Sequence, residues 1–301
     1  MKKILREKKN LISKLDPVKK AIAEVEKGEI FVVETAHHLY LYKEKLCEND
    51  LLYEIPRDII NPLTGPIKIK NTEPGDVVVI KILDIICESE GDAATNPGTG
   101  LLRSRLSSPH MMILKNDGKR IDIGDDIFVP LRPIIGSIGS TPKNPISSLM
   151  PGPHGGNLDD PSISIGAKVY LPVYIEGTNF ALGDVHAAQS DGEGVCPIDI
   201  NAIVTLKVED ILKNQNIPEI RIETNDKWII DKEGESVEEA LEKACIAMTD
   251  FLSKRLNLTE ERIGLLLTSI GGFHLSQAGN YNYPVIARAE IPKWVDTKGR
   301  L

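Results

Sequence analysis

Short runs of β-branched and other apolar residues, each bounded by glycine or proline, recur along most of this 301-residue chain and constrain its fold most strongly. Between about residues 25 and 223 they follow one another with almost no helical periodicity; clear examples are 30–33, 77–83, 168–173 and 203–208. Strong β-formers flanked by turn residues are typical of strands, and many short strands are typical of sandwiches and barrels. We therefore predict a mainly β fold built of sandwich-like or barrel-like β subdomains.

A helical pattern appears only late in the chain. After Ser236, apolar residues recur at the i, i+3, i+4 spacing of an amphipathic helix, at Val237, Ala240, Leu241, Ala244, Met248 and Phe251. Ser236 and Glu239 match a capping box, and Thr259 is placed to cap a second helix that ends at Gly271. We expect a C-terminal helical pair packed on the sheet, which makes the fold α+β overall.

Three segments differ in composition. Residues 1–24 are rich in lysine and are expected to form a charged N-terminal arm. Residues 25–140 would form an N-terminal β subdomain, and residues 141–301 a second β subdomain with the helical pair. The last two could equally form one compact unit.

Composition excludes several functional classes. The net charge of −8 disfavours a general nucleic-acid binder, which needs a basic face. No apolar run reaches the roughly 18 residues of a membrane span, and the basic start lacks the apolar run of a secretory signal. The four cysteines form no CxxC pair, which indicates reduced thiols in a cytoplasmic protein: Cys47, Cys87, Cys196 and Cys245. We therefore expect neither nucleic acid nor membrane as a partner.

Two segments concentrate histidine, carboxylate, carboxamide and glycine among turn residues: 150–160 and 182–194. In an extended strand, Asp184 and His186 would project to the same face, because side chains alternate. They could bind one metal jointly, with further ligands from His154 and Asp159, or Asp184 could instead orient the imidazole. Mixed His/Asp ligation suits zinc. A purely solvated polar turn is the alternative.

Other polar side chains have more than one interpretation. Asn157 and Gln189 are candidate hydrogen-bonding partners of a small polar substrate. His37 and His38 are adjacent after a predicted strand, so at most one should face a site. Cys196 could be a nucleophile close to His186, although a buried inert thiol is the commoner outcome.

Taken together, the segments 151–159 and 182–193 resemble the paired signature of the acetamidase/formamidase family. Supporting stretches extend over roughly residues 25–293 and include Phe31-Val32-Val33-Glu34-Thr35, Asn61-Pro62-Leu63-Thr64-Gly65, Glu73-Pro74-Gly75-Asp76 and Ile270-Gly271-Gly272-Phe273-His274. The resemblance implies hydrolysis of a small linear amide, formamide or acetamide, by an oligomeric, mainly β, metal-dependent enzyme. We expect a homo-oligomer, a dimer or larger.

The resemblance places His154, Asp159, Asp184 and His186 at the site, with Asp191 and Glu193 beside them. His37 stands where the family usually has an acidic residue, and we include it among the metal ligands. The expected metal is Zn²⁺, with Ca²⁺ as a candidate at a second site. Ser190 and Asp199 also depart from the family pattern, where Gly and Glu are usual.

This resemblance leads to a specific mechanism. The metal would bind water and the amide oxygen, while Glu193 or Asp191 takes the water's proton and returns it to the departing nitrogen. Asn157 and Gln189 would contact the substrate. The rivals are an amidase that uses Cys196 and a non-catalytic small-molecule binding protein on the same fold.

Overall fold

The computed structural model describes residues 1–41, 60–279 and 283–301, which form mainly strands. Those of the first half are β1 (Lys2–Ile4), β2 (Leu11–Ile12), β3 (Lys14–Leu15), β4 (Ala23–Val25), β5 (Ile30–Thr35), β6 (Leu63–Ile69), β7 (Val77–Thr95), β8 (His110–Asn116), β9 (Arg120–Asp122), β10 (Phe128–Pro130) and β11 (Ile134–Gly139). The second half contains β12 (Ile146–Ser147), β13 (Gly155–Asn157), β14 (Lys168–Pro172), β15 (Phe180–His186), β16 (Asp199–Leu212), β17 (Arg221–Glu223), β18 (Lys227–Gly234), β19 (Gly272–Gln277) and β20 (Val285–Pro292). The mainly β prediction is confirmed.

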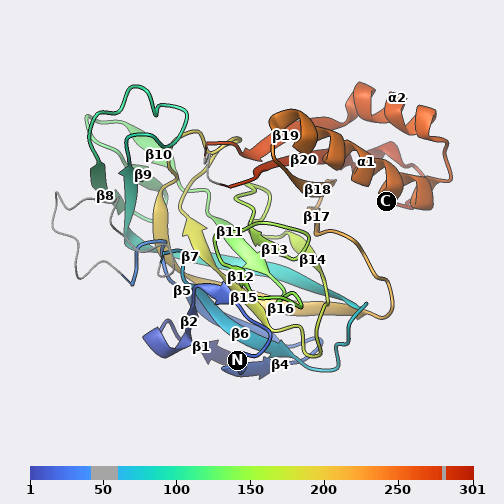
Figure 1. Cartoon of the computed structure of the whole chain (residues 1–301), viewed down its shortest axis with the longest axis horizontal. Helices are drawn as coiled ribbons and strands as arrows, with labels where there is room; N and C mark the ends of the chain where they lie inside the picture. Colours follow the sequence, from blue (N-terminus) through green and yellow to red (C-terminus); the bar gives the residue numbers. More distant parts are fainter. Residues whose placement is uncertain (42–59, 280–282) are drawn as a thin grey trace.

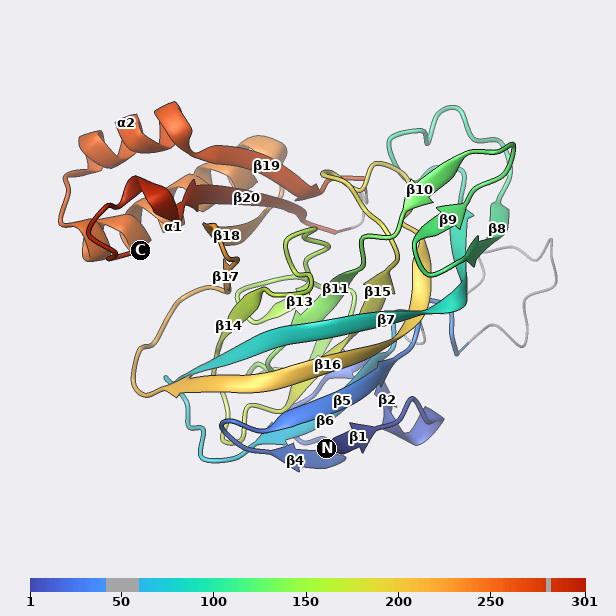
Figure 2. The same ribbon diagram turned by 180° about the vertical axis from the view of Figure 1, so that it is seen from behind.

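The strands form two layers. The long strands β7 and β16 pair with each other, and β16 also pairs with β5. On the other side of the molecule β15 pairs with β11 and β6 (Figures 1 and 2). All these strands belong to one continuous, strongly curved sheet, which in the described residues does not close into a barrel; β3 and β12 form a separate pair.

The main core lies between the layers and consists of aliphatic side chains. Its largest fully buried members include Phe31, Ile67, Ile80, Ile135 and Phe180. The scarcity of aromatic residues thus leaves β-branched side chains to fill the space, and these pack well on a pleated surface.

The N-terminal residues 1–24 are part of this sheet, in place of the expected arm. β1 runs parallel to β5, β2 pairs with β6, and β4 runs parallel to β6. Apolar side chains between the lysines are buried, and Leu15 is fully buried. The sheet also continues across residue 140, because β14 and β16 of the second half both pair with β7 of the first.

The helices form a hairpin at the C-terminal end, α1 (Val237–Leu256) and α2 (Glu260–Ile270), over β18, β19 and β20 (Figure 1). A second core joins them to the strands, with Trp228 and Phe251 at its centre. The Ser236 hydroxyl accepts a hydrogen bond from the Glu239 amide, as predicted for a helix start. Thr259 precedes α2 as expected, but its hydroxyl makes no capping bond to the backbone. Of the described helices, none is long and apolar enough to cross a membrane.

Candidate functional site

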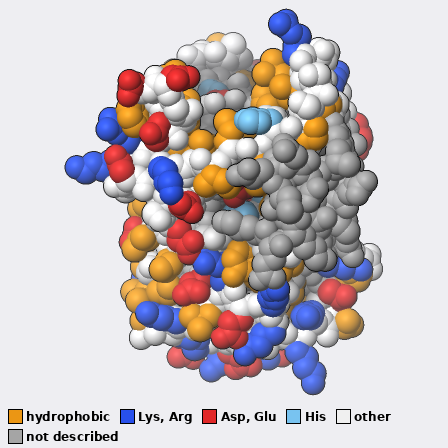
Figure 3. Space-filling view, turned by 90° about the vertical axis from the view of Figure 1, so that its left-hand side faces the viewer, with side chains coloured by type: hydrophobic (Ala, Val, Ile, Leu, Met, Phe, Trp, Pro, Cys, Tyr) orange, Lys and Arg blue, Asp and Glu red, His pale blue; other side chains and the backbone are white. Residues whose placement is uncertain are grey.

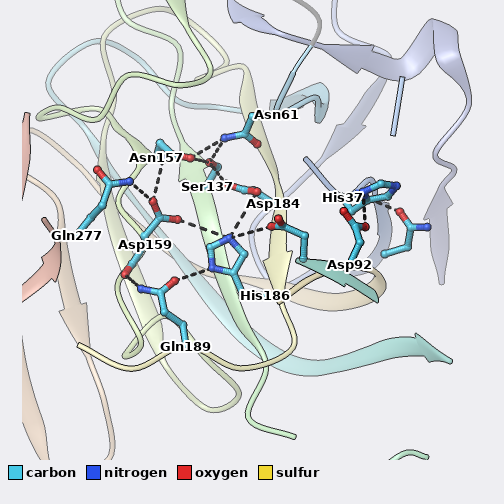
Figure 4. Close-up of polar contacts among 12 residues, drawn as sticks. His37, Asn61, Asp92, Ser137, Asn157, Asp159, Asp184, His186, Gln189 and Gln277 are labelled. Carbon is cyan, nitrogen blue, oxygen red and sulfur yellow. Dashed lines mark hydrogen bonds and ion pairs between the residues drawn. The ribbon is translucent and has the colours of Figure 1, made fainter. Parts of the chain in front are cut away.

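The two predicted polar loops meet at one end of the sheet. β15 carries Asp184 and His186, and the segment after β13 brings Asp159 against them (Figure 4). Both aspartates have a left-handed backbone, with φ of 56° at Asp184 and 49° at Asp159. Such a backbone is uncommon outside glycine, although Asp tolerates it better than most residues, and it often marks functional sites. The close approach also requires Gly136 on β11, since a Cβ there would lie 2.6 Å from Asp159 Oδ1.

Three carboxylates surround one imidazole nitrogen. His186 Nε2 lies 3.5 Å from Asp184 Oδ1, 3.8 Å from Asp159 Oδ1 and 3.4 Å from Asp199 Oδ1. We call these four residues the acid–imidazole cluster. Its side chains are all buried, and the three Oδ1 atoms have no hydrogen-bond partner. A concentration of buried negative charge without donors is costly unless a cation compensates it.

The pKa values of the cluster residues reflect this excess of buried negative charge. Burial, together with the neighbouring acids, raises the pKa of Asp199 well above its usual value. Burial and the charge of Glu193 do the same for the pKa of Asp159. Burial would lower the pKa of His186, but the adjacent carboxylate of Asp184, followed by the charges of Asp159 and Asp199, raises it well above its usual value. The cluster therefore attracts positive charge, as a proton or as a metal ion.

Carboxamides hold the cluster in place. The Gln189 Oε1 atom lies 2.6 Å from His186 Nδ1, and its Nε2 donates to the backbone oxygen of Asp159. Since the carboxamide oxygen can only accept, His186 carries a proton on Nδ1 and turns Nε2 toward the acids. Asn157 donates to Asp159 Oδ2 at 2.8 Å, and Gln277 donates to the same oxygen. Asn157 and Gln189 therefore position the site residues. Asn157 also lines the pocket, and the expected substrate contacts of both residues stay predictions.

Other polar residues at the site were absent from the sequence-based prediction. Asn61 and Ser137 both donate to Asn157 Oδ1, each at 2.6 Å. They orient Asn157, which in turn orients Asp159. Gln277 reaches the site from β19, far along the chain. Asn61, Ser137 and Gln277 all lie in stretches that resemble the family, but the sequence did not mark them as site residues.

Two groups of residues could each hold a metal ion. The first is Asp159, Asp184 and His186, and the second is His38, Asp184 and Asp199. Within each group the possible ligand atoms all lie within 4.8 Å of one another, and Asp184 belongs to both. The structure thus brings together three of the five predicted ligands and adds His38 and Asp199.

His37 and His154 belong to neither group. His37 Nδ1 lies 3.1 Å from Asp92 Oδ1, and its backbone amide donates to Asn201, so the ring is turned away from the cluster (Figure 4). Since adjacent side chains diverge, His38 occupies the position that we assigned to His37. His154 lies among the backbone atoms of its own turn, close to Gly152 and Gly156. Burial lowers the pKa of His154 to about 4, which keeps it neutral.

Glu193 and Asp191, the two predicted proton-transfer residues, lie in different surroundings. Glu193 lines the site pocket, and its Oε2 atom is buried without a hydrogen-bond partner. Burial raises the pKa of Glu193. Asp191 Oδ1 instead accepts a hydrogen bond from Arg288 Nη2 at 2.7 Å, and its Oδ2 lies 3.0 Å from His274 Nδ1. Nearly half of the Asp191 side chain is exposed. Arg288 therefore holds Asp191 away from the pocket, and the structure favours Glu193 alone.

A pocket of about 310 Å³ opens onto the cluster. Asp159, Asp184, His186 and Asp199 line its polar side, and several apolar side chains line the remainder. Cys196 is among the lining residues. Burial raises the pKa of its thiol to about 11, so the nucleophilic thiolate is scarce near neutral pH.

Comparisons with known proteins identify the family of this chain. The model of the acetamidase/formamidase family matches residues 1–150 and 143–271. The chain belongs to the acetamidase/formamidase family. Its fold is similar to the crystal structure of an acetamidase from Bacillus halodurans, with a TM-score of 0.92 and 32% identity over 99% of this chain and 100% of that one. A predicted acetamidase/formamidase from Thermoanaerobacter tengcongensis gives a TM-score of 0.90 and 30% identity over 98% of this chain and 97% of that one.

Relatives known by sequence are more distant. The acetamidase of Mycolicibacterium smegmatis is 26% identical over an alignment of 195 residues, and the match covers 44% of this chain and 48% of that protein. The chain spans about half the length of the curated relatives it matches.

Proposed function

We propose that this protein hydrolyses linear amides to a carboxylate and ammonia with the help of a divalent metal ion. The observation that supports the proposal best is the acid–imidazole cluster, whose unpartnered carboxylate oxygens border a pocket of substrate size. Membership of a family with relatives named acetamidase and formamidase agrees with this chemistry.

The residues present fit a metal ion. Buried carboxylate oxygens without donors beside an imidazole nitrogen form a donor set that suits Zn²⁺. We propose Asp159, Asp184 and His186 as one ligand group, and His38 and Asp199 with the shared Asp184 as a second. Ca²⁺ prefers six to eight oxygen ligands, so the imidazole in each group favours zinc over calcium. When bound, a divalent ion would polarise the amide carbonyl and lower the pKa of a water molecule toward neutrality.

Glu193 is the residue that we propose as proton carrier. Its raised pKa brings it closer to the operating pH, where a group can both accept and donate a proton. Glu193 would take a proton from the attacking water and deliver it to the amide nitrogen, which is a poor leaving group until protonated. Gln277 donates to Asp159 Oδ2 and thereby holds the neighbouring acid still during this exchange.

The Cys196 mechanism receives less support from the site. A thiol with a pKa of about 11 is almost fully protonated near neutral pH, and no described histidine forms a hydrogen bond with it. We therefore propose that Cys196 forms part of the pocket wall.

The decisive experiment is ammonia release before and after metal removal. Protein treated with a chelator and then dialysed should lose hydrolysis of formamide and acetamide, and Zn²⁺ should restore it. Undiminished hydrolysis by metal-free protein would rule out the metal mechanism. Amide binding without any ammonia release, in metal-loaded protein, would favour the non-catalytic alternative.

We also propose that the protein acts as a cytoplasmic homo-oligomer on a small-molecule substrate, without nucleic acid or membrane as a partner. Light scattering coupled to size-exclusion chromatography measures the oligomeric state.

A further inference from the structure

The lining of the site pocket is chemically mixed. It contains the acids and imidazoles of the proposed metal site. The remaining lining is mostly apolar, with Leu39, Ile60, Ala94, Leu149, Val195, Cys196 and Pro197, and also includes Asn96, Thr99 and Tyr283. The reacting amide group needs only the acids and imidazoles, so the apolar lining is available for the remainder of the substrate.

The volume of the pocket exceeds what a formyl or acetyl amide needs. Liquid water occupies about 30 Å³ per molecule, so a volume of 310 Å³ corresponds to roughly ten waters. Pockets for much larger organic ligands begin at about 300 Å³. Formamide or acetamide would therefore leave most of the apolar lining without contact.

One wall of the pocket is built by two segments that pack on each other, and it contains the polar Asn96 and Thr99 beside its apolar residues. A Cβ at Gly100 would lie 2.9 Å from the Val195 Cα, and the Leu101 amide donates to the Gly194 oxygen at 2.6 Å. The backbone of Ala94, on β7, forms a hydrogen bond with the Cys196 thiol. These contacts fix residues 194–196 against residues 94–101, so the wall is part of the sheet framework.

A second part of the lining consists of buried aliphatic side chains. Leu39 is 2% exposed and Leu149 is 7% exposed, although both line the pocket. The Asn61 amide donates to the His38 oxygen, which joins the chain at Ile60 to the chain at Leu39. Figure 3 shows hydrophobic side chains beside a recess of the surface in which histidine atoms are visible.

We propose that the preferred substrate is a primary amide with an apolar acyl group of about four to eight carbon atoms, larger than formamide or acetamide. The acyl group lies against the apolar lining while the carboxamide faces the acid–imidazole cluster. This inference rests on the proposed amide hydrolysis. It identifies the substrate class and changes no step of the chemistry.

A chain-length series tests the inference. The value of kcat/KM is measured with the metal-loaded protein for formamide, acetamide, butyramide, hexanamide and benzamide. Burial of one methylene is worth a factor of about four, and hexanamide has four more methylenes than acetamide, so its kcat/KM should be about 200-fold higher. A maximum at formamide or acetamide, with decline thereafter, would overturn the inference and leave the proposed hydrolysis intact.

Binding measurements distinguish failure of the substrate-class inference from failure of the proposed amide hydrolysis. Calorimetric titration with hexanamide and with acetamide needs no turnover, and hexanamide should bind at least tenfold more tightly. Equal affinities would contradict the apolar acyl site even if the protein hydrolysed no amide at all. Absence of hydrolysis with the expected difference in affinity would instead overturn only the proposed function.

Substitutions in the wall provide the structural test. Val195→Trp places a large ring in the acyl pocket and should lower the hexanamide-to-acetamide ratio of kcat/KM at least tenfold. Leu149→Phe, in the second part of the lining, should lower the same ratio and serves if the first variant folds poorly. The matched control Val18→Trp adds the same ring at a position 85% exposed and should leave the ratio unchanged. Wall variants that keep the wild-type ratio would contradict the inference.

Discussion

Two groups of acids lie side by side in this protein, and they differ in how their charge is compensated. The first is the acid–imidazole cluster. The second contains Asp160, Asp191 and Asp231, together with Arg288. The neighbouring residues Asp159 and Asp160 belong one to each group, which shows how sharply the chain separates their environments.

The second group carries its own cation. Arg288 Nη2 donates to Asp191 at 2.7 Å, and the charges of Asp160, Asp191 and Asp231 raise the pKa of its guanidinium, against the lowering effect of burial. Ser276 also donates to Asp231 at 3.1 Å. Burial, followed by the charge and proximity of Asp160, still raises the pKa of Asp231 well above its usual value.

The first group has no arginine or lysine of this kind among the contacts that the structure describes. Its acids face the imidazoles of His186 and His38, and three of their oxygens have no donor. Asp160 Oδ2 and Asp231 Oδ2 of the second group also lack donors, but that group contains the guanidinium of Arg288. The lack of such a cation in the first group is the basis of the proposed metal site.

The largest effect is expected from Asp184→Asn. Asp184 belongs to both potential ligand groups, so its loss weakens both metal positions. A metal contributes several kcal/mol to catalysis, and amide hydrolysis should fall on the order of 10⁴-fold. Steady-state ammonia release with metal analysis of the same sample measures this. Full metal content with near-normal activity would show that Asp184 is not needed for metal binding, and would contradict the proposed difference between the two acid groups.

Arg288→Met should destabilise the fold by about 2 kcal/mol, because it removes the hydrogen bond to Asp191 and the cation that compensates the buried Asp160 and Asp231. Urea denaturation provides the measurement. The control Lys243→Met breaks the surface pair with Glu239, at 2.7 Å, and should cost less than about 0.5 kcal/mol. Equal effects of the two substitutions would show that Arg288 does not compensate the second group.

Gln189→Leu keeps every candidate ligand but removes the hydrogen bonds to His186 Nδ1 and to Asp159. Loss of an orienting partner of a ligating histidine reduces metal affinity or activity by about 10- to 100-fold. Competition with a chromogenic zinc chelator measures the affinity. An unchanged affinity would argue that Gln189 has only a structural role.

Cys196 gives the smallest expected effect and the clearest pH dependence. Cys196→Ser should change kcat by no more than about twofold, since burial keeps the thiol protonated. Below its pKa of about 11, the rate of alkylation by iodoacetamide should rise about tenfold per pH unit, because only the thiolate reacts. Peptide mass spectrometry resolves Cys196 from Cys87, whose pKa burial raises to about 12. Rapid alkylation at pH 7 with loss of activity would favour the thiol mechanism.

Local patterns were sufficient to predict much of this molecule from its sequence. Runs of β-branched residues marked the strands, and an apolar stripe with Ser236 marked α1. The two glycine-rich segments also identified where the site lies, because few other segments combine so many donors and acceptors with turn residues.

The individual site residues were harder to predict, since their selection depends on tertiary contacts. His37 and His38 are adjacent in the sequence, as are Asp159 and Asp160, and only one member of each pair faces the cluster. The local backbone conformation decides which member does so. Asp191 is drawn away by Arg288, which lies almost a hundred residues later. Asp199 stands at the start of β16 opposite His186, a pairing set by strand register. None of these contacts has a local sequence signal.

The central claim is that the acid–imidazole cluster holds a divalent cation in the working protein. Inductively coupled plasma mass spectrometry of the purified wild type and Asp184→Asn tests it directly. The account predicts at least one equivalent of zinc per wild-type chain and a large loss of metal in the variant. Wild-type protein that is fully active without a stoichiometric divalent metal would contradict it.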